Sequence, residues 1–200
     1  NRPSFNLNGG LLFIQDMYYH RTDTWDRDAE YIDYFKNQKK FIESLSKDVF
    51  DMTLLRLHYS YVLNNPYEKE KWIEFNSKLK IDSGNAKLSK LIGDSRLVVY
   101  AYDSTGILET LSQNIPSIAF WHNDLDHLRE NAKPQYQLLI NVGILHLTPE
   151  SAANKINEIW DNVDEWWNHK DVVEAKGIFC KTYAKVSEKP VLELKKILTS

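Results

Sequence analysis

Cysteine is nearly absent from the chain, which has only Cys180 among its 200 residues. A disulfide needs two thiols and a thiolate zinc site needs several, so neither can form within the chain. Long apolar runs are absent too, since none approaches the roughly 18 residues of a transmembrane helix. Residues 1–9 also lack the charged and then apolar pattern of a secretory signal. These absences predict a cytoplasmic protein without a membrane span, and the start at Asn1 rather than Met indicates a piece of something longer.

An excess of positive charge is lacking as well. The chain has 25 Lys and Arg against 28 Asp and Glu, for a net charge of −3. Nucleic-acid-binding domains are usually basic, so we expect no nucleic acid partner. Aromatic residues are abundant, with six Trp and eleven Tyr. Such side chains serve both cores and sugar or partner surfaces, so their placement decides their role.

Short apolar runs alternate along the chain with segments of helical periodicity. Strands are predicted at residues 10–15, 51–58, 79–82, 97–100, 117–120 and 144–147. Helices are predicted at residues 26–46, 68–76, 85–92, 107–113, 134–141, 150–167, 172–183 and 190–198. About six strands alternating with helices predict an α/β, Rossmann-like parallel sheet with helices on both faces. Residues 10–185 would form this domain, residues 1–9 a linker or the tail of a preceding segment, and residues 186–200 a helical tail.

The segment Arg96 to Trp121 carries the clearest functional pattern. Its turn, Tyr102-Asp103-Ser104-Thr105-Gly106, joins a buried strand to a helix. Backbone amides at the positive end of a helix dipole can bind a phosphate, so the turn predicts phosphate or nucleotide binding. A plain connection capped by Ser or Asp is the alternative. Glu109, one turn into the helix, would either contact ligand or complement the dipole.

Polar residues at the ends of other predicted strands lie at the same edge of a parallel sheet. Arg56 and His58 alternate, so they share a face, where Arg56 could bind a phosphate or carboxylate and His58 could act as acid or base. A structural Arg–carboxylate pair with a hydrogen-bonded His is the alternative. Trp121 and Arg129 are candidates to contact donor or acceptor, although Arg129 could equally form a surface ion pair.

Three further groups of polar residues have plainer interpretations. Residues 18–21 follow the first strand, and a ligand or interdomain role for them stays open. The spacing of His122, Asp124, Asp126 and His127 does not match a closed zinc site, so we expect a polar loop and no metal. His146 is expected to be a hydrogen-bonded structural residue.

The run Asp103-Ser-Thr-Gly-Ile-Leu-Glu109, followed by Pro116 at the start of a strand, resembles a known pattern. It is similar to the C-terminal, donor-binding domain of GT-B glycosyltransferases and their relatives, the UDP-N-acetylglucosamine 2-epimerases and CDP-glycerol glycerophosphotransferases. Those relatives carry Asp-Ser-Gly-Gly-Ile-x-Glu-Glu before a Pro-led strand. The resemblance implies that amides at Ser104 and Gly106 hold a diphosphate and that Glu109 holds the ribose. Thr105 and Thr110 depart from the pattern.

The resemblance extends over roughly residues 10–185, including the Arg-x-His run that ends at His58 and the Trp166-Trp167 pair. It implies the donor-binding half of a GT-B fold in a bacterial surface-polysaccharide glycosyltransferase. The partners would be a nucleotide-activated sugar as substrate rather than cofactor, a glycan acceptor, and an N-terminal GT-B domain missing from the chain. Contact with the inner membrane would run through partners. A nucleotide-sugar epimerase, a phosphopolyol transferase and a non-catalytic binding or scaffolding domain remain alternatives.

Overall fold

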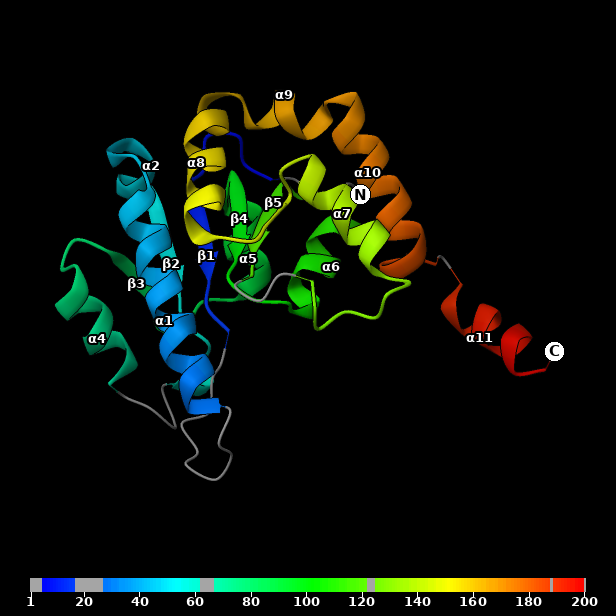
Figure 1. Cartoon of the computed structure of the whole chain (residues 1–200), viewed down its shortest axis with the longest axis horizontal. Helices are drawn as coiled ribbons and strands as arrows, with labels where there is room; N and C mark the ends of the chain where they lie inside the picture. Colours follow the sequence, from blue (N-terminus) through cyan, green and yellow to red (C-terminus); the bar gives the residue numbers. More distant parts are fainter. Residues whose placement is uncertain (1–4, 17–26, 62–66, 122–124, 188, 200) are drawn as a thin grey trace.

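A computed structural model describes residues 5–16, 27–61, 67–121, 125–187 and 189–199 of the chain. Its centre is a six-stranded sheet in the order β3-β2-β1-β4-β5-β6, in which every neighbouring pair is parallel (Figure 1). The strands are β1 (Leu11–Ile14), β2 (Thr53–Arg56), β3 (Lys80–Asp82), β4 (Leu97–Tyr100), β5 (Ser117–Phe120) and β6 (Leu145–His146). The predicted Rossmann-like α/β class is therefore confirmed.

Strand β1 lies where the strand order reverses. In the register of the sheet, Leu12 of β1 is opposite Leu54 of β2 on one side and Val98 of β4 on the other. The chain builds outward from β1 to β3, then returns to β4 and continues outward to β6. In sheets of this order, ligands bind at the carboxyl ends of the strands beside the reversal. The topology thus directs attention to the carboxyl ends of β1 and β4.

Helices cover both faces of the sheet, as the alternation of strands and helices predicts (Figure 1). Helices α1 (Arg27–Ser44) and α8 (Pro149–Ile159) cover the face that Leu11 and Phe13 bury. Helices α6 (Thr105–Ser112), α7 (Lys133–Asn141) and α10 (Lys170–Tyr183) cover the face of Leu12 and Val98. Because both faces are buried, the strands read as continuous apolar runs.

Two predicted elements differ from the structure. The strand expected at residues 51–58 is shorter, because residues 47–51 form helix α2 (Lys47–Asp51), whose Val49 amide donates to the hydroxyl of Ser46. The helix expected at residues 150–167 breaks at the 3-10 turn η1 (Trp160–Asn162) and resumes as α9 (Val163–Asn168). At this break, Arg96 Nη1 donates to the Trp160 carbonyl oxygen at 2.8 Å.

The remaining elements agree closely with the sequence. They are α4 (Glu68–Phe75), α5 (Leu88–Asp94) and α11 (Pro190–Leu198). Helix α11 stands away from the sheet at the carboxyl end of the chain (Figure 1), and the domain boundaries at residues 9 and 185 stay predictions. No helix in the described ranges is both long enough and apolar enough to cross a bilayer.

His146, at the end of β6, provides a test of the packing around the sheet. Its side chain bridges Ser151 Oγ at 2.8 Å and the Gly143 carbonyl oxygen at 3.0 Å, and burial lowers its pKa from 6.5. The unfolded chain therefore binds this proton more readily than the folded protein, so stability is lost as the pH falls below about 6.5. We expect His146→Gln to flatten this acid dependence, measured by urea unfolding from pH 7 to pH 5. An equally steep dependence in His146→Gln would contradict the prediction.

Candidate functional site

The turn after β4 opens the amino end of α6 at the reversal point of the sheet. Ser104 is the residue before the helix, in an extended conformation with φ −122° and ψ 160°, and its hydroxyl does not cap the helix. Thr105 and Gly106, which the sequence placed in the turn, are the first two helical residues. The first-turn amides and the Ser104 hydroxyl therefore lie together at the positive end of the helix dipole.

Gly106 has a packing role that the sequence did not reveal. A β-carbon built on it would lie 2.5 Å from ring atom Cε1 of Tyr100, on the preceding strand. Only glycine lets α6 approach β4 this closely, and that approach brings the helix terminus against the strand end. Thr110 is buried and its hydroxyl donates to helix carbonyls at Gly106 and Ile107, whereas Glu109 is exposed.

An ion pair joins the turn after β4 to the loop after β5. Asp103 Oδ2 lies 3.3 Å from His127 Nε2, and both side chains are about one-third exposed. Burial raises the pKa of the Asp103 carboxyl, and the neighbouring His127 opposes that rise. The Trp121 ring meets the His127 ring edge-on at 5.1 Å, and its buried indole N–H has no acceptor in the described part of the chain.

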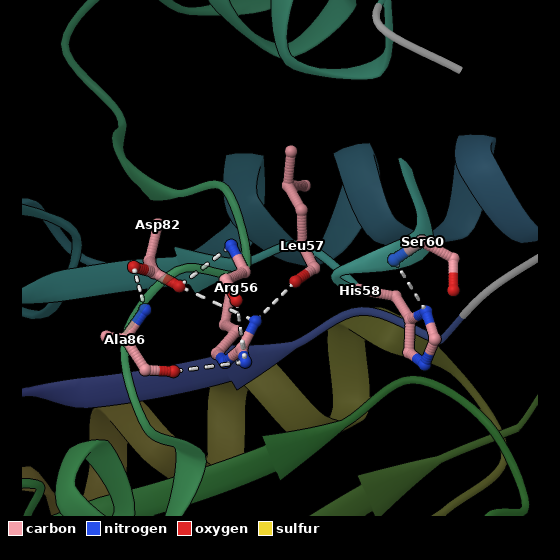
Figure 2. Close-up of polar contacts among 7 residues, drawn as sticks. Arg56, Leu57, His58, Ser60, Asp82 and Ala86 are labelled. Carbon is pink, nitrogen blue, oxygen red and sulfur yellow. Dashed lines mark hydrogen bonds and ion pairs between the residues drawn. The ribbon is translucent and has the colours of Figure 1, made fainter. Parts of the chain in front are cut away.

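On the other side of the reversal point, His58 follows β2. The Ser60 amide donates to His58 Nδ1 at 3.3 Å (Figure 2). An acceptor at Nδ1 places the hydrogen of the neutral ring on Nε2, which leaves Nε2 as a donor. Burial lowers the pKa of His58, Asp16 opposes that change, and Arg56 adds to it. His58 is thus a neutral hydrogen-bond donor near pH 7.

Arg56 is occupied by contacts within the protein. Its Nη1 donates to the Leu57 carbonyl at 2.6 Å and lies 3.5 Å from Asp82 Oδ1, and its Nη2 donates to the Gly84 and Ala86 carbonyls at 3.5 and 3.3 Å (Figure 2). Asp82 in turn accepts hydrogen bonds from the amides of Gly84 and Ala86. The guanidinium fills the turn after β3, which favours the structural alternative over direct ligand contact.

Contacts at the carboxyl edge connect β2, β1 and β4. The Tyr61 hydroxyl donates to the Asp16 carbonyl at 3.1 Å, and the Asp16 amide donates to the Tyr34 hydroxyl at 2.8 Å. The Tyr34 ring lies edge-on to the exposed Tyr102, with centroids 6.2 Å apart. Beneath them, Gln15 Nε2 donates to buried Glu68 Oε1 at 2.7 Å. Hydrogen bonds between residues as far apart as Asp16 and Tyr61 thus hold together the chain segments at the carboxyl edge of the sheet.

Not every predicted residue joins this arrangement. The Arg129 side chain is exposed, and only its backbone carbonyl makes hydrogen bonds that the structure records, to the amides of Ala132 and Lys133. Residues 18–21, together with His122 and Asp124, lie outside the described residues. Sequence reasoning missed the Asp103–His127 pair, because no spacing rule links residues on the loops of two adjacent strands.

Comparison with known proteins identifies a family. Residues 4–198 match the model of the LIC12162 family of transferases, so the chain belongs to that family. None of the curated proteins matches the chain. Among solved structures, the chain is similar to the wall teichoic acid polymerase TagF, a histidine-to-asparagine variant soaked with CDPG, with a TM-score of 0.50 and 15% identity. The match covers 98% of this chain but only 43% of TagF, so the chain spans less than half the length of that relative and shares its fold.

The contacts of Arg56 predict a large stability effect. Arg56→Met should lower the free energy of unfolding by about 3 kcal/mol, because it leaves a mostly buried carboxylate and several carbonyls without their donor. Arg56→Lys should recover less than half of that loss, since an ammonium cannot reproduce the guanidinium fork. Urea unfolding followed by circular dichroism measures both, with the exposed Arg129→Met as the matched control. Equal stability of Arg56→Met and Arg129→Met would contradict the structural role.

Proposed function

We propose that this member of the LIC12162 transferase family binds a nucleotide-activated donor at the carboxyl edge of its sheet, with the donor diphosphate on the amino end of α6. The observation that carries the proposal is the uncapped terminus of α6 at the reversal point between β1 and β4. An anion there gains hydrogen bonds from first-turn amides together with the favourable helix dipole. The resemblance of residues 103–109 to donor-binding turns supports the same location.

Side chains around this terminus supply the remaining contacts of the proposed site. The Ser104 hydroxyl does not cap the helix and can donate to a phosphate oxygen. The Nε2–H of neutral His58 is a second hydrogen-bond donor that can bind an oxygen of the leaving phosphate. The contact with His127 Nε2 engages the Asp103 carboxylate, which would otherwise repel a diphosphate. Tyr102, Thr105, Gly106, Glu109 and Trp121 would line or flank the donor, whereas Arg129 stays a predicted contact from the loop after β5.

The reaction we propose is transfer of a sugar from its nucleotide to a glycan acceptor in bacterial surface-polysaccharide synthesis. The amides of α6 and the side chain of His58 would stabilise the negative charge that develops on the departing diphosphate. The acceptor would be held by a second, N-terminal GT-B-type domain that this chain does not include. The chain alone would then bind donor without efficient turnover.

Transfer of a phosphopolyol is the second candidate. It is favoured by the fold shared with TagF, whose structure was determined after soaking with CDPG. Both reactions place a nucleotide diphosphate on the same terminus and differ in the bond that breaks. Product analysis with the full-length protein separates them, because one yields a nucleoside diphosphate and the other a nucleoside monophosphate.

A backbone variant tests the phosphate site without removing a side chain that supports the fold. Thr105→Pro deletes one amide donor at the first helical position, where proline is well tolerated. The extended conformation of Ser104 is also the one that a following proline requires. We expect Thr105→Pro to weaken binding of the preferred nucleotide at least about tenfold, measured by calorimetry against UDP-, GDP-, CMP- and CDP-linked compounds.

Thr105→Ala is the matched control, because it removes the same side chain and keeps the amide. Its affinity should stay close to that of the unmodified protein. Failure of every compound to bind at millimolar concentration would overturn the donor site. Equal affinities of Thr105→Pro and Thr105→Ala would instead contradict the placement of the phosphate on α6.

His58 is expected to affect turnover more than donor binding. In the full-length protein, His58→Ala should lower kcat by about a hundredfold, because the negative charge that develops on the departing phosphate loses a hydrogen-bond donor. The same change should alter the donor KM less than about threefold. His169→Ala, on the exposed start of α10, is the control. Unchanged kcat in His58→Ala would exclude His58 as a hydrogen-bond donor to the departing phosphate.

A further inference from the structure

A second pocket lies at the opposite end of α6 from the proposed donor site. Its volume is about 590 Å³, and it is bordered by the carboxyl end of α6, by α9 and by α10. Its lining is mainly apolar. The lining residues that matter for its chemistry are Leu111, Asn114, Asp164, Trp167, Lys176 and Gly177. None of them takes part in the proposed transfer chemistry.

Lys176 is a buried cation at this pocket, with only 6% of its surface exposed. Its Nζ donates to Asn114 Oδ1 at 2.9 Å and to the Trp167 carbonyl at 3.0 Å, and it lies 3.6 Å from the centroid of the Trp167 ring. No carboxylate of the described residues lies within ion-pair distance of it. Two of the three N–H donors of the ammonium make hydrogen bonds and the Trp167 ring faces the charge, but a buried charge without a counter-charge is still unfavourable.

The acceptor of Lys176 is held in place independently of the lysine. Asn114 has a positive φ of 56°, and the Trp167 indole N–H donates to both its carbonyl and its side-chain oxygen, at 3.2 and 3.1 Å. The ammonium is thus fixed at the pocket wall. Burial lowers the pKa of Lys176 to about 8, so most molecules still carry the charge at pH 7.

Gly177 is the second unusual feature of the pocket. It lies inside α10, where glycine costs about 1 kcal/mol relative to alanine. Gly177 is exposed, and no atom outside its own stretch of helix lies within 4 Å of a β-carbon built on it, so packing within the protein does not require glycine at this position. A mid-helix glycine without a packing reason, on the wall of a pocket, leaves room for a molecule to approach the helix.

We propose that this pocket binds a small organic monocarboxylate, whose carboxylate pairs with the Lys176 ammonium and whose apolar body lies over Gly177 and Trp167. The carboxylate supplies the missing counter-charge and accepts the third hydrogen bond. Asp164 lies on the exposed rim, where its charge disfavours ligands with a second negative charge. A single charge on an apolar body is therefore the ligand that the lining fits.

Calorimetry with benzoate tests this site in the chain as it stands, with benzamide as the uncharged compound of the same shape. We expect saturable binding of benzoate at millimolar concentration and binding of benzamide at least about tenfold weaker. Gly177→Leu should place a side chain in the pocket and abolish benzoate binding, while its Tm stays equal or rises because leucine favours the helix. Lys176→Met should abolish binding as well. Lys181→Met, which removes another lysine of α10 that does not line the pocket, should bind benzoate normally.

Several results would overturn the proposal. They are a lack of saturable benzoate binding, equal affinity for benzoate and benzamide, and undiminished binding in Gly177→Leu. Gly177→Leu decides the question even if Lys176→Met fails to fold, because position 177 has open space around it. Donor binding is measured at the other end of α6, so failure of one site is distinguishable from failure of the other.

Discussion

The parallel pairing of β1 with strands on both of its sides is the constraint on which the rest of the structure depends. Strands β2 and β4 both pair with β1 in parallel. A parallel strand can follow another only through a crossover connection that passes over one face of the sheet, and here these connections are helices that cover both faces. The chain reverses its order of growth at β1, and in sheets of this order ligands bind at the carboxyl ends of the strands beside the reversal. The proposed donor site lies at that edge.

Helix α6 places backbone N–H donors beside the reversal of strand order. It packs against Tyr100 so closely that only Gly106 fits, and this approach places its first amides at the reversal point. Its amino end is open to an anion, while its carboxyl end meets Lys176 through Asn114. Negative charge is favourable at the first end and positive charge at the second, in agreement with the direction of the helix dipole.

Polar residues at the carboxyl edge divide into those that hold the edge together and those that remain available. Arg56 is held by Asp82 and by three carbonyls, and Tyr34 supports Asp16, so these groups stabilise the loops. In the proposed site, His58 and the terminus of α6 keep the donors that would bind a ligand. Neutralising a departing phosphate there would need both kinds of group, because rigid loops hold the donors at fixed positions.

The sequence by itself determined the class of fold and the location of the turn. Apolar runs such as Leu97–Tyr100 are buried on both faces and therefore visible without a structure, and the turn at Ser104 follows from local chemistry. Only the tertiary structure decided which partner each polar residue has. Arg56 contacts Asp82 on the adjacent strand, Asp103 contacts His127, and Lys176 contacts Asn114. The partners are far apart in the sequence, and no periodic pattern of residues predicts which of them meet. Local patterns fix backbone elements, whereas long-range pairing depends on how those elements pack.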